Sequence, residues 1–106
     1  EESAVNLPNN NFIECIPNNI VVEVPGILNK SGVKGVKLEN YPSTFGSLLN
    51  NQVSTIQLTT DAVVNKSKHS AYLALLADPL VNDVNKASDL LNTMLKLQNK
   101  YLNYLK

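Results

Sequence analysis

One cysteine and one histidine, Cys15 and His69, are the residues of this chain most suited to nucleophilic or metal chemistry. They lie far apart in the sequence, and neither has a second Cys or His beside it. Zinc sites need several such ligands at short spacings, and a Cys–His nucleophile needs a third group to orient it. We therefore assign no metal ligand and no catalytic role to either residue. Cys15 is expected to be a small buried side chain, and His69 a solvated one in the first turn of a helix.

Among the acidic residues, Glu23 is the one candidate for a functional role. Val22 and Val24 flank it and Pro25 follows it, so its side chain could be directed from the end of a strand. A structural hydrogen bond or ion pair is the favoured interpretation, because ion-pair networks place carboxylates in the same way. The remaining candidates suit helix ends and solvated surfaces better than a catalytic carboxylate pair; they are Asp61, Asp78, Asp83 and Asp89.

The glycines exclude a nucleotide site from this stretch. The chain has 4 glycines, and no two of them have the G-x-G spacing of a dinucleotide fingerprint. The sequence thus assigns no catalytic, cofactor-binding or metal-ligating residue, and we expect no cofactor to bind to this chain by itself.

Length and composition indicate one small domain with a thin core, since the chain has 106 residues and is 43% hydrophobic. The formal net charge is +0 and every basic residue is a lysine, so the charge does not favour nucleic acid as a partner. No apolar run reaches the roughly 18 residues of a membrane span, and the acidic start lacks the layout of a signal peptide. A single cysteine favours a reducing, cytoplasmic location. Because the sequence does not begin with Met, we expect it to be cut from a longer protein.

The first third of the chain has the pattern of β-strands. Phe12–Ile16 and Ile20–Val24 are short apolar runs with turn residues between them, and they predict an antiparallel hairpin. Pro25–Gly26 is expected to end the second strand. A weaker strand is predicted over Val33–Leu38.

Three helices are predicted in the rest of the chain. The first starts at Pro42–Thr44 and covers about five turns, and Leu58–Thr60 is β-branched enough to allow a bend or break. Its apolar residues have spacings of three and four; these are Phe45, Leu48, Leu49, Val53, Ile56, Thr60, Val63 and Val64. The second covers Lys68–Ala77, is capped by Ser67 and is apolar nearly all round. The third begins after Asn82 or Asp83 and runs to the end of the chain.

These elements define an α+β fold, with an N-terminal strand hairpin followed by three helices. The second and third helices carry more apolar surface than two short strands can cover. Leaving it in water is costly, at roughly 25 cal/mol per Å². We therefore expect this surface to pack on a missing N-terminal part, to join copies of the chain in a homo-oligomer, or to do both.

Several short motifs occur in an order that resembles a known family. Phe12–Pro17 followed by Ile20–Pro25 resembles the paired strands near the C-terminus of family 4 glycoside hydrolases, and Val22–Pro25 is the most characteristic part. Further matches follow in the family's order: Gly32, Tyr41–Pro42, Leu58–Val63, Ala71–Val81 and Ala87–Leu91. The sequence looks most similar to the alpha-glucosidase and alpha-galactosidase members. Lys66–His69 departs from the Gly-Asp-Arg stretch expected there.

The resemblance implies that residues 1–106 are a C-terminal fragment of an NAD- and divalent-metal-dependent glycosidase, commonly one that uses Mn²⁺. Such enzymes hydrolyse O-glycosidic bonds by redox-assisted elimination. Their catalytic groups, metal ligands and NAD-binding glycines lie in an N-terminal domain that is absent here, so the fragment alone would be inactive and that domain would be its partner. The resemblance also implies a fold like the second domain of lactate dehydrogenase, a role in homo-oligomer assembly, and a glycoside as the substrate of the parent enzyme.

Two alternatives stay open at this point. The chain could be a stand-alone helical interaction or dimerisation module, which the excess of apolar surface favours. It could also be the C-terminal domain of a 2-hydroxy acid dehydrogenase, which shares the fold but fits Val22–Pro25 less well. A reading frame that extends upstream into a strand, a Gly-rich turn and a helix would favour the glycosidase over the module.

Overall fold

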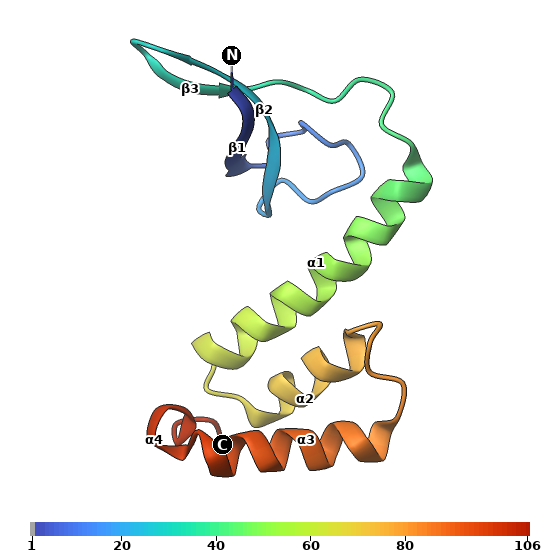
Figure 1. Cartoon of the computed structure of the whole chain (residues 1–106), viewed down its shortest axis with the longest axis vertical. Coiled ribbons are helices and arrows are strands. Elements are labelled where there is room, and N and C mark those ends of the chain that lie inside the picture. Colours follow the sequence, from blue (N-terminus) through green and yellow to red (C-terminus); the bar gives the residue numbers. More distant parts are fainter. Residues whose placement is uncertain (1) are drawn as a thin grey trace. The chain divides into compact units, whose positions relative to one another are not determined.

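The computed structural model describes residues 2–106 (Figure 1). The chain divides into two compact units, the first ending at Asn50 and the second spanning Asn51–Lys106. The elements in chain order are β1 (Glu2–Pro8), β2 (Val21–Asn29), β3 (Gly32–Gly35), α1 (Ser43–Val64), α2 (Lys68–Ala77), α3 (Val84–Leu97) and α4 (Asn99–Leu102). The α+β class and the order of strands before helices are as predicted.

The first unit contains a three-stranded antiparallel sheet in the order β1-β2-β3. Val22 and Val24 of β2 are buried and Glu23 between them is exposed, because successive side chains of a strand point to opposite faces. The predicted end of this strand was wrong. β2 continues through Pro25 and Gly26 to Asn29, and Gly26 pairs with Gly35 of β3. A side chain at Gly26 would overlap Val5 of β1, so glycine lets the strand pass there.

Phe12–Ile16, which was predicted to be a strand, lies in the loop between β1 and β2. The strand that pairs with β2 in its place is β1. The reason is Asn9, which is 0% exposed. Its amide nitrogen donates to the carbonyl oxygens of Ile13 (2.9 Å) and Ile16 (2.6 Å), and its Oδ1 accepts from the Ile13 N–H (2.9 Å). These bonds satisfy locally the backbone groups that a strand would pair with a neighbour. Ile13 and Ile16 are thereby turned into the core.

The loop also contacts the beginning of α1. Asn50 donates from its side chain to the Cys15 carbonyl oxygen at 2.5 Å. A Cβ atom at Gly46 would overlap the Cys15 sulfur, so only glycine lets the helix lie this close. α1 runs from Ser43 to Val64, without the break that the sequence allowed near Leu58–Thr60.

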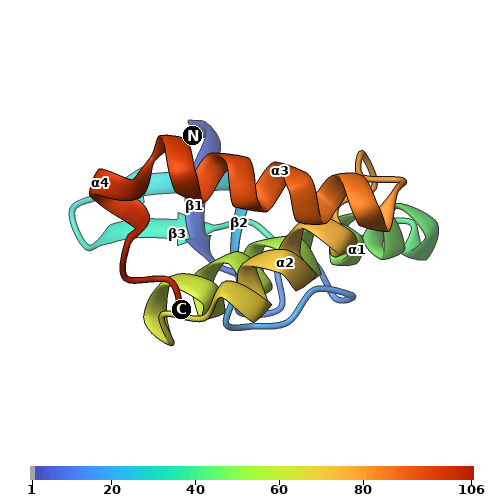
Figure 2. The same cartoon turned by 90° about the horizontal axis from the view of Figure 1, so that it is seen from below.

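In the second unit, α2 and α3 lie side by side (Figure 2). Ser67 caps α2 by accepting from the Ser70 N–H, and Asp83 caps α3 by accepting from two backbone N–H groups. The Ser67 cap was predicted, and Asp83 was one of the two predicted candidates, with Asn82. α3 ends at Leu97, whereas the sequence predicted one helix to the end of the chain.

The chain turns back after α3 because its last residue is bonded to the turn between α1 and α2. Lys106 donates its N–H to the Lys66 carbonyl oxygen (3.0 Å) and accepts from the Lys68 N–H (2.9 Å). A straight helix to residue 106 could not make these bonds, so Gln98 leaves helical geometry and the short α4 follows.

The core of this second unit is small. Its fully buried side chains are Ala62, Ala74, Ala87 and Leu91, while larger ones on the same helices are half-buried, such as Leu75 and Leu95, or exposed, such as Leu90. Alanine lets helices approach closely but removes little apolar area from water. In the part of the chain that the structure describes, no helix is long and apolar enough to cross a membrane.

We predict that Asn9→Ala lowers the free energy of unfolding of the 106-residue chain by roughly 3 kcal/mol, because buried backbone groups of the loop lose their partners. Urea unfolding monitored by circular dichroism measures the change. Asn19→Ala, at an exposed position of the same loop, is the matched control and should change stability by less than about 0.5 kcal/mol. Equal effects of the two substitutions would contradict the role given to Asn9.

Candidate functional site

The residues considered for chemistry are dispersed over the chain. Cys15 was predicted to be buried in a strand, but it lies half-buried in the loop of the first unit. His69 lies in the first turn of α2 in the second unit and is exposed, as predicted. Glu23 is exposed on β2, where it pairs in register with Asn6 of β1. Cys15 and Glu23 thus belong to the first unit and His69 to the second.

Each of three candidate aspartates has a local structural role. Asp83 caps α3, Asp78 accepts from the Leu80 N–H at 2.9 Å, and Asp61 accepts from the Gln57 side chain at 3.0 Å. Asp89 is exposed on α3. These positions agree with helix-end and surface residues.

Glu14 and Lys37 form the shortest ion pair of the described residues, with 2.6 Å between the lysine nitrogen and Oε1. The hydrogen bond from Lys37, together with its positive charge, lowers the pKa of Glu14 below its ordinary value. The same bond to Glu14 raises the pKa of Lys37. Both groups are solvated, so the pair joins the loop to the segment after β3 without forming a reactive centre.

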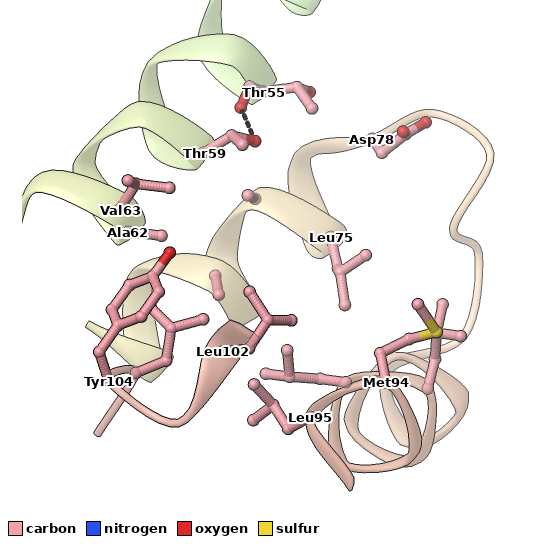
Figure 3. Close-up of a pocket in the computed structure, with 15 residues that line it drawn as sticks. Thr55, Thr59, Ala62, Val63, Leu75, Asp78, Met94, Leu95, Leu102 and Tyr104 are labelled. Carbon is pink, nitrogen blue, oxygen red and sulfur yellow. Dashed lines mark hydrogen bonds between the residues drawn. The ribbon is translucent and has the colours of Figure 1, made fainter. Parts of the chain in front are cut away.

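The most distinctive surface feature is an apolar hollow in the second unit (Figure 3). It has a volume of about 510 Å³ and is lined by the second half of α1, by α2, by α3 and by residues 102–105. Leu75, Leu95 and Leu102 point toward it, and Met94 lies at its edge. This size is typical of a ligand pocket, but the lining is almost entirely apolar.

One buried side-chain oxygen of a residue that lines the hollow is left without a partner. Thr55 Oγ1 is buried and makes no hydrogen bond, the only such side-chain atom among the described residues. The neighbouring Thr59 hydroxyl bonds instead to the Thr55 carbonyl oxygen at 2.8 Å (Figure 3). Leaving a buried hydroxyl unpaired lowers the stability of a fold by roughly 1–3 kcal/mol.

The predicted apolar face of α1 is largely uncovered. Phe45, Leu48 and Ile56 are 59%, 66% and 55% exposed. The residues of α1 that are buried inside the units are Gly46 and Ala62. Sequence periodicity therefore found a real apolar stripe, but within this chain the residues that α1 buries are small ones. The predicted excess of uncovered apolar surface is confirmed.

Comparisons with known proteins identify the family. The model of the family 4 glycosyl hydrolase C-terminal domain matches residues 1–81. An alpha-glucosidase of Erwinia rhapontici is 40% identical over 106 residues, which is 100% of this chain and 23% of that protein. An alpha-galacturonidase of Thermoanaerobacterium saccharolyticum is 33% identical over 92% of this chain and 21% of its own length. The chain belongs to family 4 of the glycosyl hydrolases and matches their C-terminal domain.

Solved structures show the same fold. A 6-phospho-alpha-glucosidase from gut microorganisms, crystallised with NAD and Mn²⁺, has a TM-score of 0.84 and 29% identity, over 93% of this chain and 23% of that one. A second such structure, with NAD and glucose-6-phosphate, has a TM-score of 0.87 and 26% identity, over 95% of this chain and 23% of that one. This chain thus spans about a quarter of the length of its relatives.

The residues present in this chain do not fit the NAD and Mn²⁺ found with those relatives. Among residues 2–106 no three His, Cys, Asp or Glu side chains cluster as a metal site would require. The glycines lack the spacing that lets a backbone approach a pyrophosphate. We derive no catalytic step from this chain's own residues.

The Glu14–Lys37 pair yields a prediction about pH. Because folding lowers the pKa of Glu14, its stabilising effect is present above the unfolded-state pKa and is lost as the pH falls through the folded-state value. Because folding raises the pKa of Lys37, its effect is lost as the pH rises through its folded-state value. Replacing Lys37 with Gln should therefore raise the pKa of Glu14 toward its ordinary value, as measured by an NMR titration of the carboxyl carbon.

The control is Lys34→Gln, which removes a neighbouring exposed lysine of β3 and should leave the Glu14 titration unchanged. An unchanged pKa of Glu14 in Lys37→Gln would show that the ion pair does not persist in solution.

Proposed function

We propose that this chain is the C-terminal structural part of an NAD- and divalent-metal-dependent glycosidase that cleaves O-glycosidic bonds by redox-assisted elimination. The observation that carries the proposal is the family match over residues 1–81. Relatives described as an alpha-glucosidase and an alpha-galacturonidase, and a similar structure holding NAD and Mn²⁺, support the reaction class. The match to this family also favours a glycosidase over a 2-hydroxy acid dehydrogenase.

The role of this part is to support the rest of the enzyme. Its candidate chemical residues are dispersed, whereas its apolar side chains are concentrated on α1 and in the hollow of the second unit. Apolar surface of this kind is typical of a protein interface. The catalytic groups, the metal ligands and the NAD site then belong to an N-terminal portion of the parent, a cytoplasmic protein that forms homo-oligomers.

Recognition of the sugar is also assigned to the N-terminal portion. One relative is described as an alpha-glucosidase and another as a probable 6-phospho-beta-glucosidase. Members of the family therefore differ in the glycosides they are named for. This chain contains no arginine to hold a phosphate with paired N–H groups. We therefore expect the choice between phosphorylated and free sugars to be made mainly outside residues 1–106.

We predict that the full-length protein carrying this sequence hydrolyses 4-nitrophenyl glycosides or their 6-phosphates only with NAD⁺ and Mn²⁺ present, and that the 106-residue chain gives no turnover under any of these conditions. The elimination removes a proton from the carbon next to the anomeric carbon, so products formed in D₂O should carry deuterium there. Release of nitrophenol and mass spectrometry of the sugar measure the two effects.

The matched control is His69→Ala in the full-length protein, which should retain turnover and its dependence on Mn²⁺. Activity of the 106-residue chain alone, or turnover of the full-length protein without NAD⁺ and without deuterium uptake, would contradict the proposal.

A further inference from the structure

The charges of this chain are unevenly distributed, although its formal net charge is +0. Six of the nine lysines lie in Asn51–Lys106, together with four of the nine acidic residues. Two of these lysines line a second hollow of the same unit, between α2 and α3, with a volume of about 420 Å³. We call it the lysine pocket; its lining residues are Lys68, His69, Tyr72, Ser88, Leu91, Asn92 and Lys106.

The fold brings the two lysines of the pocket together from distant parts of the sequence. The Lys68 N–H donates to the Lys106 carbonyl oxygen at 2.9 Å, and the Lys106 N–H donates to the Lys66 carbonyl oxygen at 3.0 Å. Residue 106 is thereby held at the start of α2 (Figure 2). Because these bonds join backbone groups, they do not use the ammonium groups of the two side chains, which are exposed.

The positive charge of the pocket has no counter-ion among the described residues. No carboxylate side chain of residues 2–106 lines the pocket, and Asp89, which follows Ser88 on α3, is outside it. Neither lysine of the pocket forms an ion pair with an acidic residue in this part of the chain. Like charges that share a site repel each other, so an anion bound between them would lower the energy of this arrangement.

Neutral groups of the pocket add hydrogen-bond donors. The Lys68 ammonium donates to Asn92 Oδ1 at 2.8 Å. This bond directs the amide oxygen of Asn92 to the lysine, so the N–H groups of the amide are the ones that can face a ligand. Ser88 contributes a hydroxyl. Ammonium, amide and hydroxyl donors without a carboxylate are suited to an oxyanion, and lysine binds phosphate as a point charge.

The number of charges favours a phosphate group over a carboxylate. A phosphate monoester carries roughly −1.5 to −2 charge at pH 7, so it can neutralise both lysines at once. A carboxylate carries a single charge and would leave one lysine unpaired. Nucleic acid would require a stripe of basic residues along the surface, whereas the pocket concentrates its charge on Lys68 and Lys106.

We infer that the lysine pocket binds the phosphate group of a small molecule, with Lys68 and Lys106 as its charged partners and Asn92 as a hydrogen-bond donor. The phosphate is either free inorganic phosphate or part of a phosphorylated sugar, and the test includes both. The inference does not depend on the proposed glycosidase activity, since neither NAD nor metal binding enters it.

The first test measures binding to the 106-residue chain. His69 is the only histidine of this chain and lines the pocket, so the NMR signals of its ring report occupancy. Inorganic phosphate and glucose 6-phosphate should shift these signals saturably, with dissociation constants on the order of 1–10 mM, because ion pairs of exposed groups are weak. Glucose, and KCl at matched ionic strength, should produce no saturable shift.

Matched substitutions assign the binding to the two lysines. The double variant Lys68→Gln with Lys106→Gln should weaken phosphate binding at least about fivefold, because both charged partners are lost. Lys96→Gln with Lys100→Gln removes the same charge from exposed positions outside the pocket and should change binding by less than about twofold. Circular dichroism checks that both variants keep the helical content of the parent chain.

The second test concerns the full-length protein. Pyridoxal 5′-phosphate forms imines with lysines, and borohydride fixes them for peptide mass spectrometry. Lys68 or Lys106 should be modified at least about fivefold faster than Lys96, because the phosphate of the reagent is held in the pocket. Pyridoxal, which lacks the phosphate, should show no such preference, and inorganic phosphate should remove it.

The outcomes decide the inference. Tighter binding of glucose 6-phosphate than of inorganic phosphate would support the site and identify a sugar phosphate as its ligand, whereas equal binding would support a site for the phosphate group alone. Equal weakening in the two double variants, or saturable binding of glucose, would overturn it. Equal modification of all three lysines in the full-length protein would overturn it as well, whether or not that protein is an active glycosidase.

Discussion

Burial of apolar surface constrains what residues 51–106 can do. The side chains that these helices bury fully are three alanines and Leu91, whereas several leucines are only half-buried. Leu90, Met94 and Tyr101 remain exposed. The burial of apolar area must offset the conformational entropy that every ordered residue loses on folding. Alanine side chains bury little apolar area and therefore contribute little to this stabilisation. The same helices would gain stability from a neighbour that covers the hollow. This agrees with the proposed role of the unit as a support for the rest of the enzyme.

The first unit is organised differently, by a polar side chain. Asn9 holds the loop through three hydrogen bonds and turns Ile13 and Ile16 inward, and the loop in turn contacts the start of α1 through Cys15. Its carboxylate Glu14 pairs with Lys37 at the surface. Residues that were considered for chemistry thus have structural roles in this unit. This agrees with a domain that forms only about a quarter of the length of its relatives.

Local signals in the sequence predicted the helices well and the strands less well. Ser67 was recognised as a cap, and Asp83 as one of two candidates with Asn82, because such side chains accept from free N–H groups in the first turn. The prediction of a strand at Phe12–Ile16 was wrong because the Asn9 side chain satisfies backbone groups of this segment in a loop. Apolar periodicity does not encode that contact. The end of α3 depends on a bond from Lys106 to Lys66, far away in the sequence. The hollow was foreseen only as excess apolar surface, since its shape and its unpaired hydroxyl arise from tertiary packing.

Hydrogen exchange tests the central claim most directly. The backbone amides of α2 and α3 would be followed by mass spectrometry in the 106-residue chain and in the full-length protein under the same conditions. If the exposed apolar surface of these helices is covered by the rest of the polypeptide, their amides should exchange at least about tenfold more slowly in the full-length protein. Identical exchange rates in the two proteins would show that this surface has no intramolecular partner, and would contradict the account.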